Sequence, residues 1–338
     1  MTRKTTDLLA DPVAQFEAAL SQWGPLALDA DALRLHSHAW TVDLSLSAAD
    51  REHEAAHPVP FYGFEELDLQ LTVRTSGDGS YNVVTARGGQ ATANGQRTAI
   101  IPIVGPITPF ALPEWMERYG IKVASLPKIV ASARAAANDP DVSRIVLAIH
   151  SPGGSVYGMP EAAAALREVA KRKKMVASIN YLGASAAYWL AATTSEITAT
   201  PSALIGSVGA AIRHVSFARM AEMDGVDVTD ISIPASKRDV TEFKQLSETG
   251  KAELTNIVAV AYEQFKTDIS ATRRLDFTAH GEQYARVVPA ADALGLNLVD
   301  RVATFDTVLG EGPSIDLPGV TRRARARLAH LKRNSTDA

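Results

Sequence analysis

A buried strand that ends in two glycines is the feature that most constrains this chain. Residues 145–149 are apolar without alternation, and Ser151-Pro-Gly-Gly-Ser155 follows one residue later. An unbroken apolar run is typical of a strand inside a parallel sheet, and the proline and glycines predict a turn where it ends. Because glycines leave backbone N–H groups unobstructed, this turn can offer amides to a bound group.

A second predicted strand, at residues 175–180, leads to a serine. Tyr181-Leu-Gly-Ala-Ser185 follows it and opens a helix rich in small residues. Ser185 lies at the start of this helix, where the positive end of the helix dipole favours a developing alkoxide. One strand end that offers amides and another that offers a serine together predict an acyl-transfer site.

Composition restricts the available chemistry. The 338 residues contain no cysteine, which excludes disulfides, thiolate metal sites and a cysteine nucleophile. The formal charge of -4 gives no overall attraction to nucleic acid. The first residues lack the apolar core of a signal peptide, and no run of about 18 apolar residues occurs. We therefore expect a soluble cytoplasmic protein that binds neither a membrane nor nucleic acid.

Predicted strands and helices alternate from Thr98 onward. Strands are expected at 99–104, 144–149, 175–180 and 196–199. The helices between and after them are expected at 126–138, 160–174 and 185–194. This order indicates βαβ crossovers and a parallel sheet. Farther along, we expect strands within 204–215 and 226–233, a long helix at 248–270 and a closing segment at 290–299.

The chain divides into three predicted parts. Residues 1–95 form an N-terminal extension of unknown role, with helices expected at 12–23 and 29–36 and a hairpin at 67–85. Residues 96–310 form the main domain. Residues 311–338 form a basic tail, either a solvated helix or a docking segment for an acidic partner.

Five stretches resemble peptidase family S49, the signal-peptide-peptidase-A-like serine proteases, and especially its phage branch of prohead proteases. They are Ile149-His-Ser-Pro-Gly-Gly154, Ala184-Ser-Ala-Ala-Tyr-Trp189, Ile205-Gly-Ser-Val-Gly209, Ala235-Ser-Lys237 with Leu246-Ser-Glu248, and the segment 290–300. Their common order and spacing are more specific than any one of them. The resemblance implies an α/β fold with a ClpP/crotonase-like core of repeated ββα units and a parallel sheet, plus a small N-terminal α+β extension.

The resemblance also implies a serine endopeptidase with a Ser/Lys dyad. Ser185 corresponds to the nucleophile, Lys237 to the general base, and Ser207 to the residue whose hydroxyl orients the lysine. The amides near Gly153 and Gly154, with that of Ser185, would stabilise the oxyanion. A lysine acts as a base only where an apolar, water-poor environment lowers its pKa. The residues near Lys237 are apolar enough for this, namely Val228, Ile231, Ile233 and Pro234.

Other histidines and lysines offer alternative bases. His214 lies in the region from which a histidine completes a Ser-His-Asp triad in the related ClpP group, so it is the alternative base. Lys244 ranks behind Lys237 because it lies in a charged run, and we expect His150 to bond to backbone at a strand end. No zinc-binding His-Glu-x-x-His motif or nucleotide-binding glycine loop occurs, so we expect no metal and no cofactor.

The expected partners follow from the same resemblance. It favours a phage head maturation protease that acts in the host cytoplasm, within the prohead, on scaffold, portal or coat protein and on itself. Single-copy relatives form rings in which neighbouring protomers complete each other's dyads, so we expect a homo-oligomer with shared active sites. Small residues around the site favour Ala, Leu or Val at the cut.

Three other functions remain open. One is a bacterial cytoplasmic peptidase similar to signal peptide peptidase A. A second is a non-catalytic capsid scaffolding protein on the same fold. A third is crotonase-type acyl-CoA chemistry, which shares the oxyanion loop but has no use for a serine nucleophile.

Overall fold

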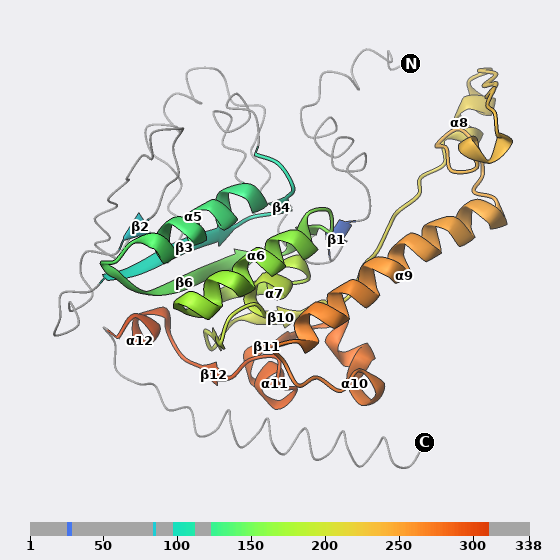
Figure 1. The fold of residues 1–338 in the computed structure, drawn as a ribbon. Coiled ribbons are helices and arrows are strands. Elements are labelled where there is room, and N and C mark those ends of the chain that lie inside the picture. The colour runs from blue at the N-terminus through green and yellow to red at the C-terminus, as the bar shows by residue number, and fades with distance from the viewer. Residues whose placement is uncertain (1–25, 29–83, 86–96, 112–122, 311–338) are drawn as a thin grey trace, which may run out of the picture.

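A mostly parallel sheet runs through the centre of the computed structural model, which describes residues 26–28, 84–85, 97–111 and 123–310. The predicted N-terminal helices, most of the predicted hairpin and the basic tail lie outside these residues. Strands β3 (Arg97–Val104), β6 (Val142–Ser151) and β8 (Lys174–Ala184) pair in parallel. The mixed α/β class and the parallel sheet are therefore confirmed (Figure 1).

Strand β8 pairs with two further strands on its other side. Strand β9 (Glu196–Ala199) runs parallel to its first half, and β10 (Leu204–Gly206) runs parallel to its last residues. Shorter strands complete the sheet. They are β2 (Val84–Thr85), antiparallel to β3, β11 (Val287–Pro289), antiparallel to β10, and β12 (Arg301–Val302), parallel to β9.

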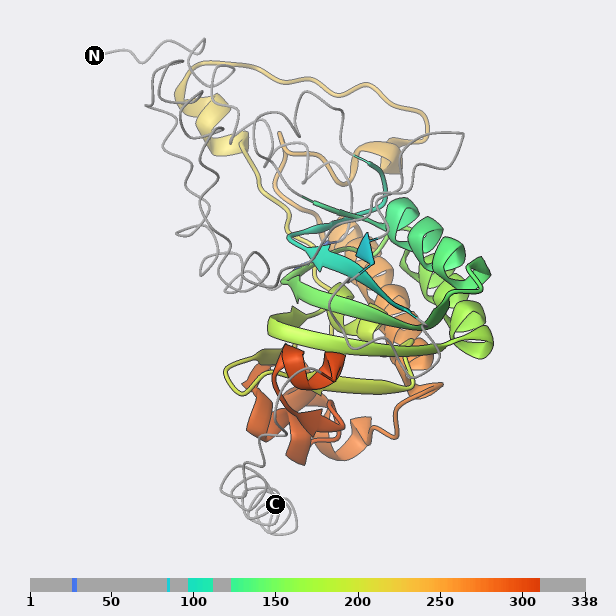
Figure 2. The same cartoon turned by 90° about the vertical axis from the view of Figure 1, so that its left-hand side faces the viewer.

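Helices cover both faces of the central strands, which explains the unbroken apolar run at residues 145–149 of β6. Alternate residues, such as Ile145, Leu147 and Ile149, pack in one cluster with α5 (Leu126–Asn138), α6 (Met159–Arg172), α7 (Ala186–Ala191) and α9 (Glu248–Ser270). The residues between them, Val146 and Ala148, pack in a second cluster with α12 (Phe305–Leu309). Figure 2 shows α12 on the face of the sheet opposite α5 and α6.

A second, smaller sheet differs from the sequence prediction. The glycines after β6 do not form a turn, because Gly153–Ser155 is strand β7. It lies between β1 (Leu26–Leu28) and β4 (Ile107–Thr108), and β4 pairs in turn with β5 (Ala124–Ser125). Since β1 and β2 both come from the predicted N-terminal extension, that extension contributes strands to both sheets.

Residues 207–247, which we call the arm, connect β10 to α9 and extend away from the sheet beside the outer end of α9 (Figure 1). The arm contains helix α8 (Ala218–Met223) and a 3-10 turn, η2 (Ala235–Arg238). The prediction of a strand at 226–233 is wrong. Its apolar side chains are largely exposed, and no described strand pairs with this segment.

The remaining predictions agree closely with the structure. The helices expected at 126–138 and 248–270 have these bounds, whereas the segment from residue 290 begins with helix α11 (Ala290–Gly295). Helix α10 (Phe277–Tyr284) was not predicted. No helix in the described part of the chain combines the length and apolarity needed to cross a bilayer.

Two aromatic side chains anchor helix α7. The Trp189 ring stacks on Phe265 of α9 with ring centroids 4.4 Å apart, and its Nε1–H donates to Asp268 at 2.9 Å. The Tyr188 hydroxyl donates to the Leu298 carbonyl at 2.9 Å. Asp268 also pairs with Arg167 of α6 at 3.1 Å. The helix that follows Ser185 is thus held by α9 and by the segment around Leu298, and Arg167 ties this part of α9 to α6.

We predict that Trp189→Ala lowers the free energy of unfolding by about 3–5 kcal/mol, because it opens a cavity and removes a donor from a buried carboxylate. The matched control is Tyr157→Ala, since Tyr157 is 51% exposed and should change stability by less than about 1 kcal/mol. Urea unfolding followed by far-ultraviolet circular dichroism measures both. Equal midpoints for the two variants would contradict this account of α7.

Candidate active site

Ser185 forms a sharp turn between β8 and α7. Its backbone has φ 54° and ψ -125°, and the residue is only 1% exposed. A positive φ at a residue other than glycine stores about 1–3 kcal/mol of strain and tends to mark functional sites. A similar strained strand-to-helix turn presents the nucleophilic serine of α/β-hydrolases. The local geometry therefore suits the predicted nucleophile.

The Ser185 amide has a structural partner. Its N–H donates to the Gly206 carbonyl at 2.8 Å, which ties the turn to β10. This amide, which was predicted to help bind an oxyanion, is thus already hydrogen-bonded within the chain. The next amide, that of Ala186, is the first of helix α7, and the first N–H groups of a helix have no acceptor within it. Sequence reasoning missed Ala186, although its place in the predicted helix was a sufficient signal.

The two glycines of β7 begin beside the Ser185 turn. Strand pairing sets Ser151 opposite Gly183, two residues before Ser185, and β7 starts two residues after Ser151. The Gly153 N–H donates to the Ser151 hydroxyl at 3.1 Å. At position 154 a Cβ atom would lie 2.0 Å from the Ile107 carbonyl oxygen, so β4 leaves room only for glycine. The close packing of β7 against β4 is thus one reason why residue 154 is a glycine.

Ser207 lies next to the Ser185 turn through the pairing of β10 with β8, which sets Gly206 opposite Ala184. Ser207 also has a positive φ, 53°, and its N–H donates to the Arg286 carbonyl at 2.9 Å. Gly206 has φ 128°, and a Cβ there would lie 2.1 Å from the Arg286 carbonyl oxygen. Residues 206 and 207 are therefore held closely against the nucleophile turn.

We predict that Gly206→Ala lowers the free energy of unfolding by about 2–3 kcal/mol, because the new methyl group meets backbone that cannot give way. Gly209→Ala is the control, since a Cβ at that position has no atom within 4 Å. Thermal unfolding of both variants tests the claim. A Gly206→Ala protein as stable as the Gly209→Ala protein would refute it.

Lys237 is exposed on the arm rather than buried beside Ser185. It belongs to the short turn η2, and its neighbours Ile231 and Ile233 are 92% and 94% exposed. In one copy of the chain these apolar residues therefore leave the lysine open to solvent. Among the described residues, no hydrogen bond joins Ser185 to Lys237. A single copy of the chain does not assemble the predicted dyad.

The alternative bases have partners within the arm. Asp230 pairs with Arg238 at 2.7 Å and with Lys244 at 3.2 Å, and the hydrogen bonds from Arg238 and then Lys244 lower the pKa of the Asp230 carboxyl. Lys244 is therefore held in an ion pair. The His214 Nε2 donates to the Thr241 carbonyl at 3.0 Å, so this ring has a structural role in the arm.

His150 lies at the end of β6, where its Nδ1 donates to the Asn180 carbonyl at 3.0 Å. This confirms the expectation of a backbone hydrogen bond at a strand end. Its ring also meets the Tyr181 ring edge-on, with centroids 5.8 Å apart. His150 is thus a structural neighbour of the glycine strand.

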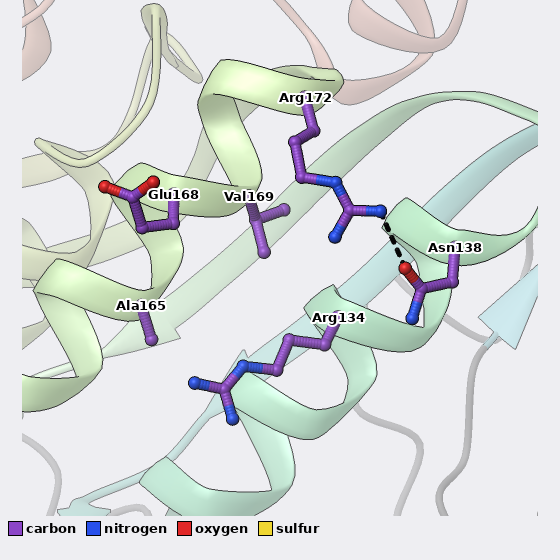
Figure 3. Close-up of a pocket in the computed structure, with 6 residues that line it drawn as sticks. All are labelled: Arg134, Asn138, Ala165, Glu168, Val169 and Arg172. Atoms are coloured by element: carbon purple, nitrogen blue, oxygen red, sulfur yellow. Dashed lines mark hydrogen bonds between the residues drawn. The ribbon is translucent and has the colours of Figure 1, made fainter.

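A surface pocket between α5 and α6 is separate from this site. It is lined by Arg134, Asn138, Ala165, Glu168, Val169 and Arg172 (Figure 3). The Arg172 guanidinium donates to the Asn138 side chain at 2.7 Å across it. None of the predicted catalytic residues lines the pocket. The described residues contain no group of three or more metal-ligating side chains.

Comparison with known proteins supports the resemblance seen in the sequence. The model of the family described as peptidase family S49 matches residues 167–312, which include Ser185, Ser207 and Lys237. The protein named "Probable protease SohB" from Haemophilus influenzae is 28% identical over 171 residues, which cover 49% of this chain and 47% of that protein.

Two phage proteins are similar over the same extent. "Capsid assembly protease C" of Escherichia phage lambda is 28% identical over 174 residues, covering 52% of this chain and 40% of that protein. "Head-tail preconnector protein GP5" of Enterobacteria phage P21 is 29% identical over 174 residues, covering 52% of this chain and 35% of that protein. The chain spans about half the length of the first bacterial and archaeal relatives it matches.

Proposed function

We propose that the chain is a serine endopeptidase of peptidase family S49, whose model matches residues 167–312, with Ser185 as nucleophile and Lys237 as general base. The observation that carries the proposal is the strained, buried turn at Ser185, which lies beside a glycine strand and follows the central strand of a parallel sheet. A serine that only packed a helix against a strand would not require a positive φ.

The proposed reaction has two halves. Lys237 removes the proton from the Ser185 hydroxyl, whose oxygen attacks the scissile carbonyl, and the amine half of the peptide leaves with a proton from the same lysine. Water then releases the acyl group from Ser185, again with Lys237 as base. The amides of Gly153 and Ala186 are the donors for the oxyanion, and Gly153 would exchange its bond to Ser151 for one to the substrate. The amide of Gly154 points to the other side of β7 from that of Gly153, so it does not reach the same oxygen.

We further propose that Lys237 comes from a neighbouring copy in a homo-oligomeric ring. The arm that carries Lys237 extends from the sheet and exposes Met223, Ile231 and Ile233, which is more apolar surface than solvated loops ordinarily show. Packing this surface against a second copy would remove the lysine from water, which a neutral amine at physiological pH requires. The ion pair of Asp230 with Arg238 supports this by ordering the turn that holds Lys237.

For the substrate, we propose phage scaffold, portal or coat protein, cleaved in the host cytoplasm within the prohead. The similarity to a capsid assembly protease and a head-tail preconnector protein supports this choice. The second candidate is a bacterial cytoplasmic peptidase, which the similarity to the SohB protein favours. Both candidates use the same chemistry at Ser185.

We predict that Ser185→Ala and Lys237→Ala each lower casein hydrolysis by at least about 1000-fold, because each removes one half of the dyad. Lys244→Ala is the matched lysine control and should keep activity within about threefold, as should His214→Ala. An inactive His214→Ala protein beside an active Lys237→Ala protein would establish a histidine base instead. A folded chain that hydrolyses nothing would favour the scaffolding function.

Mixing two inactive variants tests whether active sites are shared. When Ser185→Ala and Lys237→Ala chains are co-expressed, a ring with shared sites contains some sites with both residues intact, about a quarter of the total for random assembly. We therefore expect casein hydrolysis to return to about that fraction of the unmodified level. Hydrolysis that stays at the level of the separate variants would mean that each chain completes its own site.

A further inference from the structure

Strand β7 has a second occupant on the side away from β4. Leu26, Ala27 and Leu28 pair antiparallel with Ser155, Gly154 and Gly153. These three residues form β1 and come from a region more than a hundred residues earlier in the chain. On its other side β7 pairs with β4 through Gly154 and Ile107. Without β1, the glycine strand would therefore present an unpaired edge.

An unpaired edge of this kind binds extended peptides by adding them as a further strand. Backbone hydrogen bonds supply the affinity, so an edge of glycines imposes little selection through side chains of its own. A strand of three residues makes few such bonds, so β1 can be displaced by a competing peptide. The β7 edge is therefore able to exchange one strand for another.

Strand β1 runs along β7 in the same direction that a bound substrate would have to run to reach Ser185. Its last residue, Leu28, is paired with Gly153, at the end of β7 nearest to Ser151. Ser151 is opposite Gly183, two residues before Ser185. A strand antiparallel to β7 therefore runs towards the nucleophile turn with its carboxyl end. The part of a substrate that precedes the scissile bond must approach Ser185 in this direction, since its last carbonyl is attacked.

We propose that residues 26–28 are an internal occupant of the peptide-binding edge and restrain the site until another peptide displaces them. The inference rests on the proposed function and adds a regulation to it. The sequence Leu-Ala-Leu is apolar and includes a small residue, which fits the Ala, Leu or Val expected at the cut. The substrate class is accordingly an extended, apolar stretch of polypeptide that adds to β7 as a strand.

Two proline substitutions provide a matched pair for the test. Successive residues of a strand point their N–H groups to opposite sides, so either Ala27→Pro or Leu28→Pro removes a donor that faces β7, and the other removes one that faces away. In the Ser185→Ala background, hydrogen exchange measured on fragments that contain Gly153–Ser155 reports occupancy without catalysis. We expect one proline variant to exchange faster there and the other to match its parent.

Activity is measured in chains that retain Ser185, with a fluorogenic apolar peptide. The proline variant that loses protection should show kcat/KM raised by about 10-fold through a lower KM, as expected if about nine-tenths of the sites are occupied by β1. The other proline variant should match the unmodified chain. The inference would be overturned if the two proline variants and their parent showed equal hydrogen exchange at Gly153–Ser155, or if the two proline variants and the unmodified chain showed equal kcat/KM.

A serine-reactive fluorophosphonate separates this inference from the proposed function. If the probe labels Ser185 and kcat/KM is the same in the three chains, the serine peptidase stands and the internal occupant is wrong. If the probe labels no chain and no chain hydrolyses peptide, the proposed function is wrong, and the restraint on substrate falls with it. Labelling together with the 10-fold rise supports both.

Discussion

The parallel pairing of β8 with the strands on its two sides is the constraint on which the rest of the structure depends. Strand β6 lies along one side, while β9 and β10 share the other. Because β10 ends beside Ala184, the Gly206 carbonyl meets the Ser185 N–H and holds the serine in a conformation that a free chain would avoid. Helix α7, anchored through Trp189 and Tyr188, fixes the other end of the turn.

In this arrangement the proposed nucleophile lies on the buried sheet, whereas the proposed base lies on the exposed arm. Ser185, the glycine strand and Ser207 lie against buried strands, whereas Lys237 lies on an arm whose apolar side chains face solvent in one copy. A nucleophile needs fixed geometry, and a lysine base needs removal from water. In this chain the first requirement is met by the sheet, and the second by contact with another copy under our proposal.

Strand β7 connects catalysis with peptide binding. The strand starts close to the Ser185 turn. One of its edges pairs with β4, and the other pairs with β1, which comes from the first part of the chain. If this edge holds substrate, access to Ser185 is a competition between strands of similar composition. The first part of the chain then influences the active site, although the sequence alone indicates only an extension of unknown role.

The sequence by itself determined the elements whose signals are local. Segments rich in apolar residues identified β3, β6 and β8, helical periodicity identified α5 and α9, and the small residues after Gly183 identified the serine turn. Only the tertiary structure decided which backbone groups are already paired. In the structure the Ser185 amide donates to the Gly206 carbonyl, and the glycines predicted to form a turn form strand β7 instead. Residues 26–28 pair with the edge of this strand, and Lys237 is exposed. These outcomes depend on pairing between segments distant in sequence, and short-range patterns of hydrophobicity carry no information about such pairing.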